Sequence, residues 1–207
     1  YRSSHVIDEI YSPEVMEAAL RIYNGKALIN SVNGKKESMD AIFPLVKKYG
    51  GAVIALTLDE NGIPETAQGR FEIAKKIVDT AATYGIPKHD IIVDALAMTI
   101  STGWEAAAVT LETLRLLRDE LGVHTSLGVS NVSFGLPQRE NINAAFFTMA
   151  LQNGLGAAII NPNSEAMLRA YDAFCALSGA DPQCAAYIEK YAQAPAVSPA
   201  AAKTDVS

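Results

Sequence analysis

The sequence predicts an α/β fold in which strands and helices alternate around a parallel sheet. Two observations lead to this prediction. Apolar runs of four to six residues with little polar alternation recur along the chain, and such runs are typical of strands buried on both faces. Each run is followed by a loop and a helical pattern of about ten or more residues, which is the connection that parallel strands require.

The elements are expected in a regular order. Residues 5–7 are compatible with the end of a strand, with Asp8 at its tip. Ser12-Pro13-Glu14 then offers a cap, a proline at the first helical position and an acid in the first turn, so a helix begins here, and Gly25 is its expected stop. Five clear strands follow, at 27–32, 52–56, 90–96, from 127 onward, and at 157–161. The helical patterns lie at 39–50, 67–84, 106–122, 140–153, 167–177 and 184–192.

Composition restricts the class of protein. The 207 residues are 49% hydrophobic and 19% charged, with a net charge of -6, which suits one soluble domain with a sizeable core, expected over 1–192. The absence of a basic cluster argues against a nucleic-acid partner, and no apolar run approaches the roughly 20 residues of a membrane span. Cys175 and Cys184 form no disulfide framework, and the three histidines are scattered, so we expect no metal site and a cytoplasmic setting. Residues 193–207, rich in Ala and Pro, are expected to be a linker or a disordered tail.

Each of the five clear strands ends in a carboxylate or an amide: Asn30, Asp59, Asp94, Asn131 and Asn161. Such residues are depleted within strands, and at the carboxyl ends of parallel strands they would converge on one site. Helix capping is the alternative, and it explains Asn161 and Asp59 better than Asn30 and Asp94, which lie inside apolar runs. We therefore predict a site formed by Asn30, Asp94 and Asn131, whose donors and acceptors suit a flat heterocycle.

The segment 127–139, LGVSNVSFGLPQR, is the clearest candidate for a functional loop. It begins as an apolar strand, becomes polar at Ser130 and Asn131, and breaks at a glycine and a proline before the next helix. Capping of that helix is again the alternative. Arg139 is the cation nearest this loop, either at the site or in a first helical turn that faces solvent.

Counting the βα units leaves two architectures open. A (β/α)8 barrel has eight units in about 250 residues, whereas a doubly wound sheet can be complete with five. The phosphate-binding patterns GxGxxG and GxxxxGK[ST] follow none of the strands, so the common nucleotide-binding versions of these folds are disfavoured.

Four segments carry a family resemblance: 29–34, 50–66, 91–96 and above all 127–147, with its GVSNVS motif. They resemble the pterin-binding methyltransferases, which comprise the methyltetrahydrofolate:corrinoid methyltransferases and the folate-binding module of cobalamin-dependent methionine synthase. The resemblance covers nearly all of residues 13–192. Dihydropteroate synthases share the fold but are more distant in this loop pattern.

The resemblance implies an enzyme of one-carbon metabolism and methionine biosynthesis. Such an enzyme binds 5-methyltetrahydrofolate in the mouth of a TIM barrel and transfers its methyl group to cob(I)alamin on a corrinoid protein or cobalamin domain. It implies that Asn131 is the catalytic residue, which hydrogen-bonds the N5 region of the pterin. Asp94 and Asn30 match the residues that hold the polar edge of the pterin.

The remaining correspondences concern the loops and the first strand. By resemblance, Gly128 and Ser130 line the site, Arg139 lies near the folate, and Asp8 is the candidate for the aspartate of the third barrel strand. The chain thus corresponds to a barrel that lacks its first two or three strands, and its uncovered apolar edge predicts a homo-oligomer. Another pterin-barrel reaction, such as dihydropteroate synthesis, and a non-catalytic half-barrel remain as alternatives.

Overall fold

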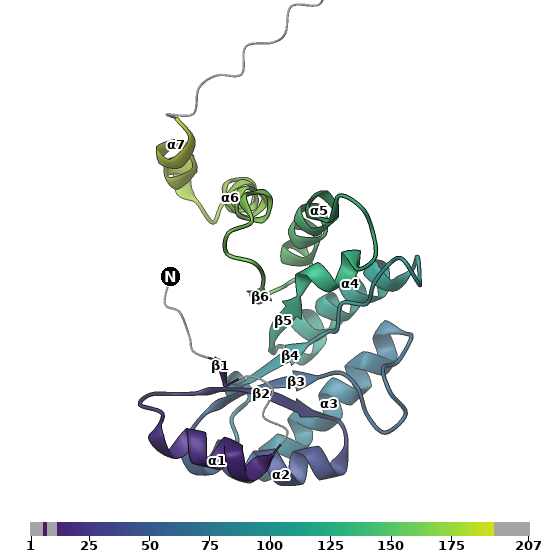
Figure 1. The fold of residues 1–207 in the computed structure, drawn as a ribbon, viewed down its shortest axis with the longest axis vertical. Helices are drawn as coiled ribbons and strands as arrows, with labels where there is room; N and C mark the ends of the chain where they lie inside the picture. The colour runs from purple at the N-terminus through teal and green to yellow at the C-terminus, as the bar shows by residue number, and fades with distance from the viewer. Residues whose placement is uncertain (1–5, 8–11, 193–207) are drawn as a thin grey trace, which may run out of the picture.

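The computed structural model describes residues 6–7 and 12–192 and contains a six-stranded, entirely parallel sheet. The strands pair in chain order, β1-β2-β3-β4-β5-β6. Figure 1 shows them as an arc, with the helices along its outer side. Asp8 and residues 193–207 lie outside the described residues.

Strands and helices alternate as the sequence predicts. The strands are β1 Val6–Ile7, β2 Leu28–Asn33, β3 Ala52–Leu56, β4 Ile91–Asp94, β5 His124–Gly128 and β6 Ala157–Ile159. The α-helices are α1 Pro13–Ile22, α2 Lys36–Tyr49, α3 Ala67–Thr83, α4 Ala106–Leu116, α5 Arg139–Gln152, α6 Glu165–Ser178 and α7 Ala185–Tyr191. In the described part of the chain, no helix has the length and apolar character needed to cross a membrane.

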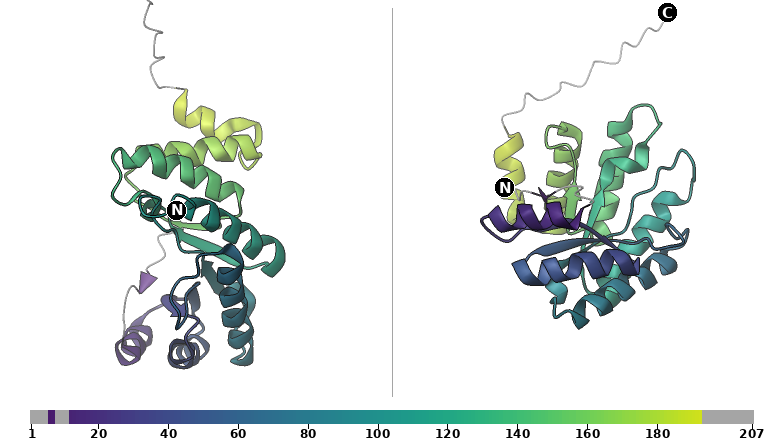
Figure 2. Two further views of the ribbon diagram at one scale, coloured as in Figure 1. Left: turned by 90° about the vertical axis from the view of Figure 1, so that its right-hand side faces the viewer. Right: turned by 60° about the horizontal axis from the view of Figure 1, so that its bottom comes forward.

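The strand order decides between the two architectures. A doubly wound sheet reverses its order at a switch point, whereas these six strands follow the chain without a reversal. The prediction of an α/β fold of the (β/α)8-barrel type is therefore confirmed, as an open arc of six strands in the described residues. In Figure 2, α6 and α7 lie at the end of the molecule farthest from α1 and α2.

Several boundaries differ from the prediction. β5 begins at His124 rather than at residue 127, and the segment in which the strand was expected to give way to a loop forms a 3-10 helix over Val129–Ser133. The helix expected over 106–122 changes to a π-helical turn at 117–121. The first helix ends at Ile22, where its last turn is closed by the backbone N–H of Tyr23, before the expected stop at Gly25.

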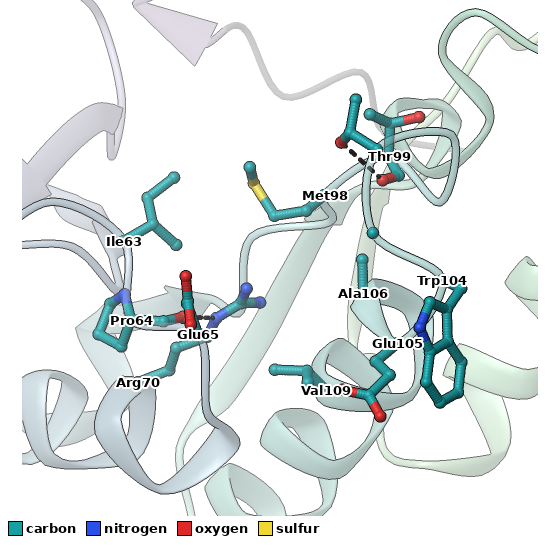
Figure 3. Close-up of a pocket in the computed structure, with 12 residues that line it drawn as sticks. Ile63, Pro64, Glu65, Arg70, Met98, Thr99, Trp104, Glu105, Ala106 and Val109 are labelled. Atoms are coloured by element: carbon teal, nitrogen blue, oxygen red, sulfur yellow. Dashed lines mark hydrogen bonds between the residues drawn. The ribbon is translucent and has the colours of Figure 1, made fainter.

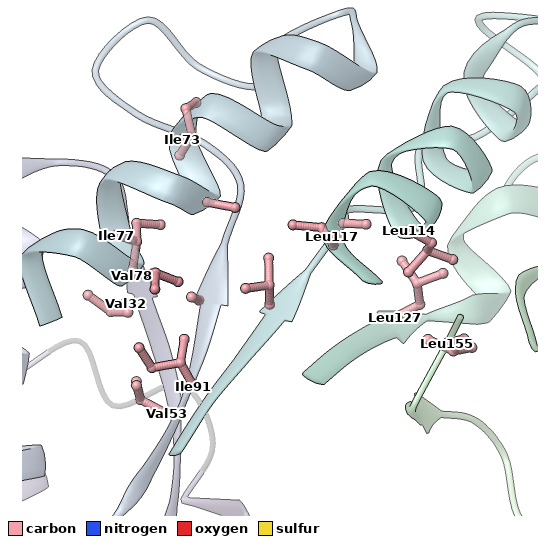
Figure 4. Close-up of a cluster of buried hydrophobic side chains, with 14 of the residues drawn as sticks. Val32, Val53, Ile73, Ile77, Val78, Ile91, Leu114, Leu117, Leu127 and Leu155 are labelled. Carbon is pink, nitrogen blue, oxygen red and sulfur yellow. The ribbon is translucent and has the colours of Figure 1, made fainter. Parts of the chain in front are cut away.

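The core lies between the sheet and the helices. In Figure 4, Ile77 and Val78 of α3 face Val53 and Ile91 of the sheet, and Leu127 packs near α4. Alternate residues of the strands are buried in this layer because successive side chains of a strand point to opposite faces. The other face of the sheet carries the buried Ile54 and, near the strand ends, polar residues such as Asp94.

Replacing Leu127 with alanine should lower the free energy of unfolding by about 2–5 kcal/mol, because its side chain is 0% exposed in the core. Leu177 on α6 is 85% exposed, so Leu177→Ala should change stability by less than about 0.5 kcal/mol. Urea unfolding of both variants measures the difference. Equal losses would mean that the layer between α4 and β5 does not pack as described.

Candidate functional site

A cavity of about 880 Å³ lies where the carboxyl ends of the strands meet. Its lining includes five of the residues predicted for the site, namely Asn30, Asp94, Gly128, Ser130 and Asn131. They come from β2, from β4, from the last residue of β5 and from the 3-10 helix that follows it. Three strands thus deliver amide, carboxylate and hydroxyl groups to one concave surface.

An irregularity in β2 places two consecutive residues in this lining. The pairing of β2 with β3 shifts register between Asn30 and Val32, and Asn30 and Ser31 both line the cavity. In a regular strand, successive side chains would face opposite sides of the sheet. A bulge of this kind redirects side chains beside functional sites.

Asp94 is the most deeply buried acid of the site, with 7% of its surface exposed. Its carboxylate accepts a hydrogen bond from the backbone N–H of Leu96 at 2.8 Å and a longer one from the hydroxyl of Ser126 at 3.5 Å. Burial raises the pKa of Asp94 to about 6, although both hydrogen bonds and the charge of Arg70 lower it. A carboxylate in this state can bind N–H donors of a ligand strongly once it is ionised.

The loop after β5 is arranged around Gly128. A Cβ atom at this position would lie 2.9 Å from Nδ2 of Asn131, so only glycine leaves room for the Asn131 amide beside the end of the strand. The following 3-10 helix, Val129–Ser133, carries Asn131 to the edge of the cavity. The close approach of residue 128 therefore limits where the Asn131 amide can lie.

Arg139 supports the loop and is not part of the cavity lining. Its guanidinium donates to the carbonyl of Ser130 at 2.8 Å and to the hydroxyl of Ser133 at 2.9 Å, and lies 5.1 Å from the ring centre of Phe134. Both hydrogen bonds tie the first turn of α5 to the 3-10 helix that carries Asn131. Asp8, the other residue predicted for the site, lies outside the described residues.

Gly128→Ala should displace the Asn131 amide, with little loss of stability because the atom it meets is the end of a flexible side chain. We expect at least about a tenfold loss of affinity for a ligand in this cavity, because the displaced Asn131 amide could no longer form its hydrogen bond to that ligand. Gly156→Ala is the matched control, because its Cβ would find ordinary contacts, the nearest at 3.5 Å. Calorimetric titration and thermal unfolding separate the two effects. Unchanged affinity in Gly128→Ala would refute this role.

Two of the five polar strand ends serve local turns. The carboxylate of Asp59 accepts from the backbone N–H of Asn61 at 2.8 Å, and the side-chain oxygen of Asn161 accepts from that of Asn163 at 3.0 Å. Neither residue lines the cavity. Their places agree with the local role that capping chemistry suggested for them.

Other lining residues were not singled out from the sequence. Ser31, Asn33, Glu37 and Ser38 add polar groups from β2 and the start of α2. For Ser31 a signal lies in the polar residues that interrupt the apolar run 27–32, but the irregularity of β2 that places it in the lining has no signature in the sequence. Glu37 and Ser38 on α2 have no such signal. Among the described residues, no group of three or more His, Cys, Asp or Glu is placed to hold a metal ion.

A second cavity of about 390 Å³ lies between the loops that follow β3 and β4. Figure 3 shows it bordered by Ile63 and Pro64 on one side and by Trp104 and Val109 on the other. Ile63 and Met98 line both cavities. The two spaces are thus neighbours at the same end of the sheet.

Comparisons with known proteins identify relatives of this chain. The sequence profile of the family described as pterin binding enzyme matches residues 6–161. The chain is 31% identical over 186 residues to the methylcorrinoid:tetrahydrofolate methyltransferase of Eubacterium limosum, over 87% of this chain and 68% of that protein. It is 36% identical over 160 residues to the methionine synthase of Mycobacterium tuberculosis, over 71% of this chain and 13% of that protein. The chain therefore spans about two thirds of the first relative and a small part of the second.

Solved structures agree with the fold. A dihydropteroate synthase from Yersinia pestis superposes with a TM-score of 0.56 at 13% identity, over 81% of this chain and 78% of that chain. One from Clostridium difficile, solved in the presence of pteroic acid, has a TM-score of 0.60 at 20% identity, over 81% of this chain and 65% of that chain. At these identities, the likeness concerns the fold.

Proposed function

Because this chain belongs to the pterin-binding enzyme family, we propose that it is a methyltransferase module that binds a reduced folate in the larger cavity. The methyl group of 5-methyltetrahydrofolate would pass between the pterin and a corrinoid carried by a partner domain or protein. Residues that stabilise the transition state of this transfer lower the barrier for both directions.

The residues of the cavity fit a pterin. Its polar lining consists of amides and hydroxyls with the carboxylates of Glu37 and Asp94, a set that matches the N–H and C=O edges of a flat heterocycle. The buried Asp94 carboxylate is the observation that supports this proposal most, because ligand N–H donors would replace the water that burial removes. A negative lining disfavours a ligand that binds through phosphate.

The proposed roles follow from position. Asn30 and Asp94 hold the polar edge of the pterin, and Ser130 with Gly128 shapes the loop beside it. Asn131 hydrogen-bonds the N5 region, where charge changes as the methyl group leaves or arrives, so it is the proposed catalytic residue. Arg139 keeps that loop in place through Ser130 and Ser133.

The corrinoid supplies the cobalt centre that accepts or donates the methyl group, so the protein needs no nucleophile of its own. The chain would act in the cytoplasm beside a cobalamin domain or corrinoid protein, which must approach the open carboxyl end of the strands. The residues described here bind and orient the pterin and stabilise the charge at N5.

The decisive experiment is calorimetric titration of the protein with 5-methyltetrahydrofolate, followed by a spectroscopic assay of methyl transfer to cob(I)alamin. We expect one site per chain and transfer that depends on Asn131. Binding of dihydropterin diphosphate in preference to methyltetrahydrofolate would favour another pterin-barrel reaction. The absence of any pterin binding, in this chain and in a longer version, would contradict the proposal.

We further propose that the chain self-associates through uncovered apolar surface. On α1, Val15 and Ile22 are 55% and 87% exposed, which agrees with an apolar surface near the first strand. Light scattering at rising concentration should detect dimers or larger species, and Ile22→Lys should reduce them. A stable monomer at high concentration would contradict self-association.

A further inference from the structure

Arg70 is a buried cation beside the site that the proposed function does not use. It lies near the start of α3 with 3% of its surface exposed. Its guanidinium donates from Nε to the carbonyl of Pro64 at 3.0 Å, and from Nη1 to the carbonyls of Ala95 and Leu96 at 2.9 and 2.8 Å. It therefore ties the loop after β3 to the segment that follows Asp94.

The segment it holds has an unusual backbone. Leu96 has a φ of 59°, a left-handed conformation that is costly for any residue with a Cβ and persists only where contacts enforce it. Its N–H donates to the Asp94 carboxylate, and its carbonyl accepts from Arg70 and from the hydroxyl of Thr110 at 3.2 Å. Hydrogen bonds thus hold Leu96 at both its N–H and its carbonyl. The residue also lines the larger cavity.

We propose that Arg70 is a positioning residue, which holds residues 95–96 in the turn that directs the Asp94 carboxylate toward the pterin cavity. The proposal deepens the proposed function and rests on it for the identity of the ligand. In Figure 3 the guanidinium lies beside Pro64 and below Met98, on the side of the smaller cavity. Arg70 thus acts on Asp94 through the backbone carbonyls of residues 95 and 96, and it does not line the larger cavity itself.

The charge of Arg70 also acts on Asp94. Ser126 of β5 donates to this carboxylate, and Thr57, which follows β3, donates to the backbone carbonyl of Asp94. Both are neutral, whereas α3 contributes the charge of Arg70. Glu37 of α2 lines the same cavity. Because the positive charge of Arg70 opposes the effect of burial on the pKa of Asp94, removing it should make this carboxyl group harder to ionise.

Three variants separate geometry from charge. Arg70→Met removes both, Arg70→Lys keeps the charge but cannot form the forked contacts of a guanidinium, and Arg115→Met removes an exposed arginine of α4 as the control. The first readout is a pH titration of the Asp94 carboxyl carbon by ¹³C NMR in the ligand-free protein, assigned with Asp94→Asn. The second is the affinity for 5-methyltetrahydrofolate at pH 7.5.

We expect Arg70→Met to raise the Asp94 midpoint by about half a pH unit or more and to weaken folate binding about tenfold or more. Arg70→Lys should keep the midpoint near that of the wild type yet still lose affinity, and the control should change neither. A wild-type midpoint and affinity in both Arg70 variants would overturn the proposal. If Arg70→Met does not fold, wild-type affinity in both Arg70→Lys and Thr110→Val would overturn it instead. Since the titration uses no ligand, failure of all proteins to bind folate would contradict the proposed function separately.

Discussion

Replacing Asn131 with alanine should slow methyl transfer to cob(I)alamin about a hundredfold more than it weakens folate binding. A hydrogen bond to N5 that strengthens as charge changes there is worth more in the transition state than in the ground state. Loss of one such preorganised group typically costs on the order of 3 kcal/mol. Single-turnover transfer at saturating 5-methyltetrahydrofolate, with affinity measured separately, distinguishes the two effects.

Asn161→Ala is the matched control for this variant. Asn161 follows the next strand of the sheet, but its side chain closes a local turn and does not line the cavity. We expect the control to transfer at the wild-type rate. Equal losses of binding and rate in Asn131→Ala would make Asn131 a binding contact, and unchanged values in both would remove it from the site.

Asp94→Asn should stabilise the protein above pH 6 while it weakens folate binding. The pKa of Asp94 is raised to about 6 in the folded protein, against about 3.9 in an unfolded chain. The folded state therefore holds this proton more tightly, and stability is lost as the pH rises from about 4 through 6. At pH 8 the loss is at most about 3 kcal/mol, and asparagine avoids it while still accepting from the Leu96 N–H.

Urea unfolding of both proteins at pH 4 and pH 8 measures this effect. The variant should be more stable by about 1–3 kcal/mol at pH 8 and similar to the wild type at pH 4. Its folate affinity should fall about tenfold or more, because a neutral amide replaces a charge-assisted acceptor. The wild-type affinity should rise as the pH passes 6, relative to the variant. A variant less stable than the wild type at pH 8 would contradict this prediction, because it would mean that the folded protein stabilises the ionised form of Asp94.

Much of the fold follows from local rules. Ser12 and Pro13 start α1 as expected, and β3 occupies 52–56 as predicted, because all five of its residues are apolar and the central three are buried. The predicted start of β5 at residue 127 is too late, because the strand begins with the polar residues 124–126. Thr125 is buried in that strand, where its hydroxyl donates to the carbonyl of Gly154 at 2.7 Å, and such a contact with a distant loop leaves no local signal.

Part of the cavity lining also follows from the sequence. Polar residues at strand ends led to Asn30, Asp94 and Asn131, since parallel strands bring their carboxyl ends together. The supporting groups were not predictable. Arg70 reads as a solvated residue in an amphipathic helix, and only the fold brings the carbonyls of residues 64, 95 and 96 to it.

The pairing of β1 to β6 in chain order has a consequence for how the protein folds. In the described residues, neighbouring strands are separated by one α-helix, with a short 3-10 or π-helical segment beside it in three of the connections. No step therefore has to wait for distant ends of the chain to meet. Loop-closure entropy is then small and similar for every step, and folding can start at one βα unit and spread to its neighbours, as it does in repeat proteins. The residues that line the larger cavity come from separate βα units. They would therefore come together only when the last of these units packs against its neighbour.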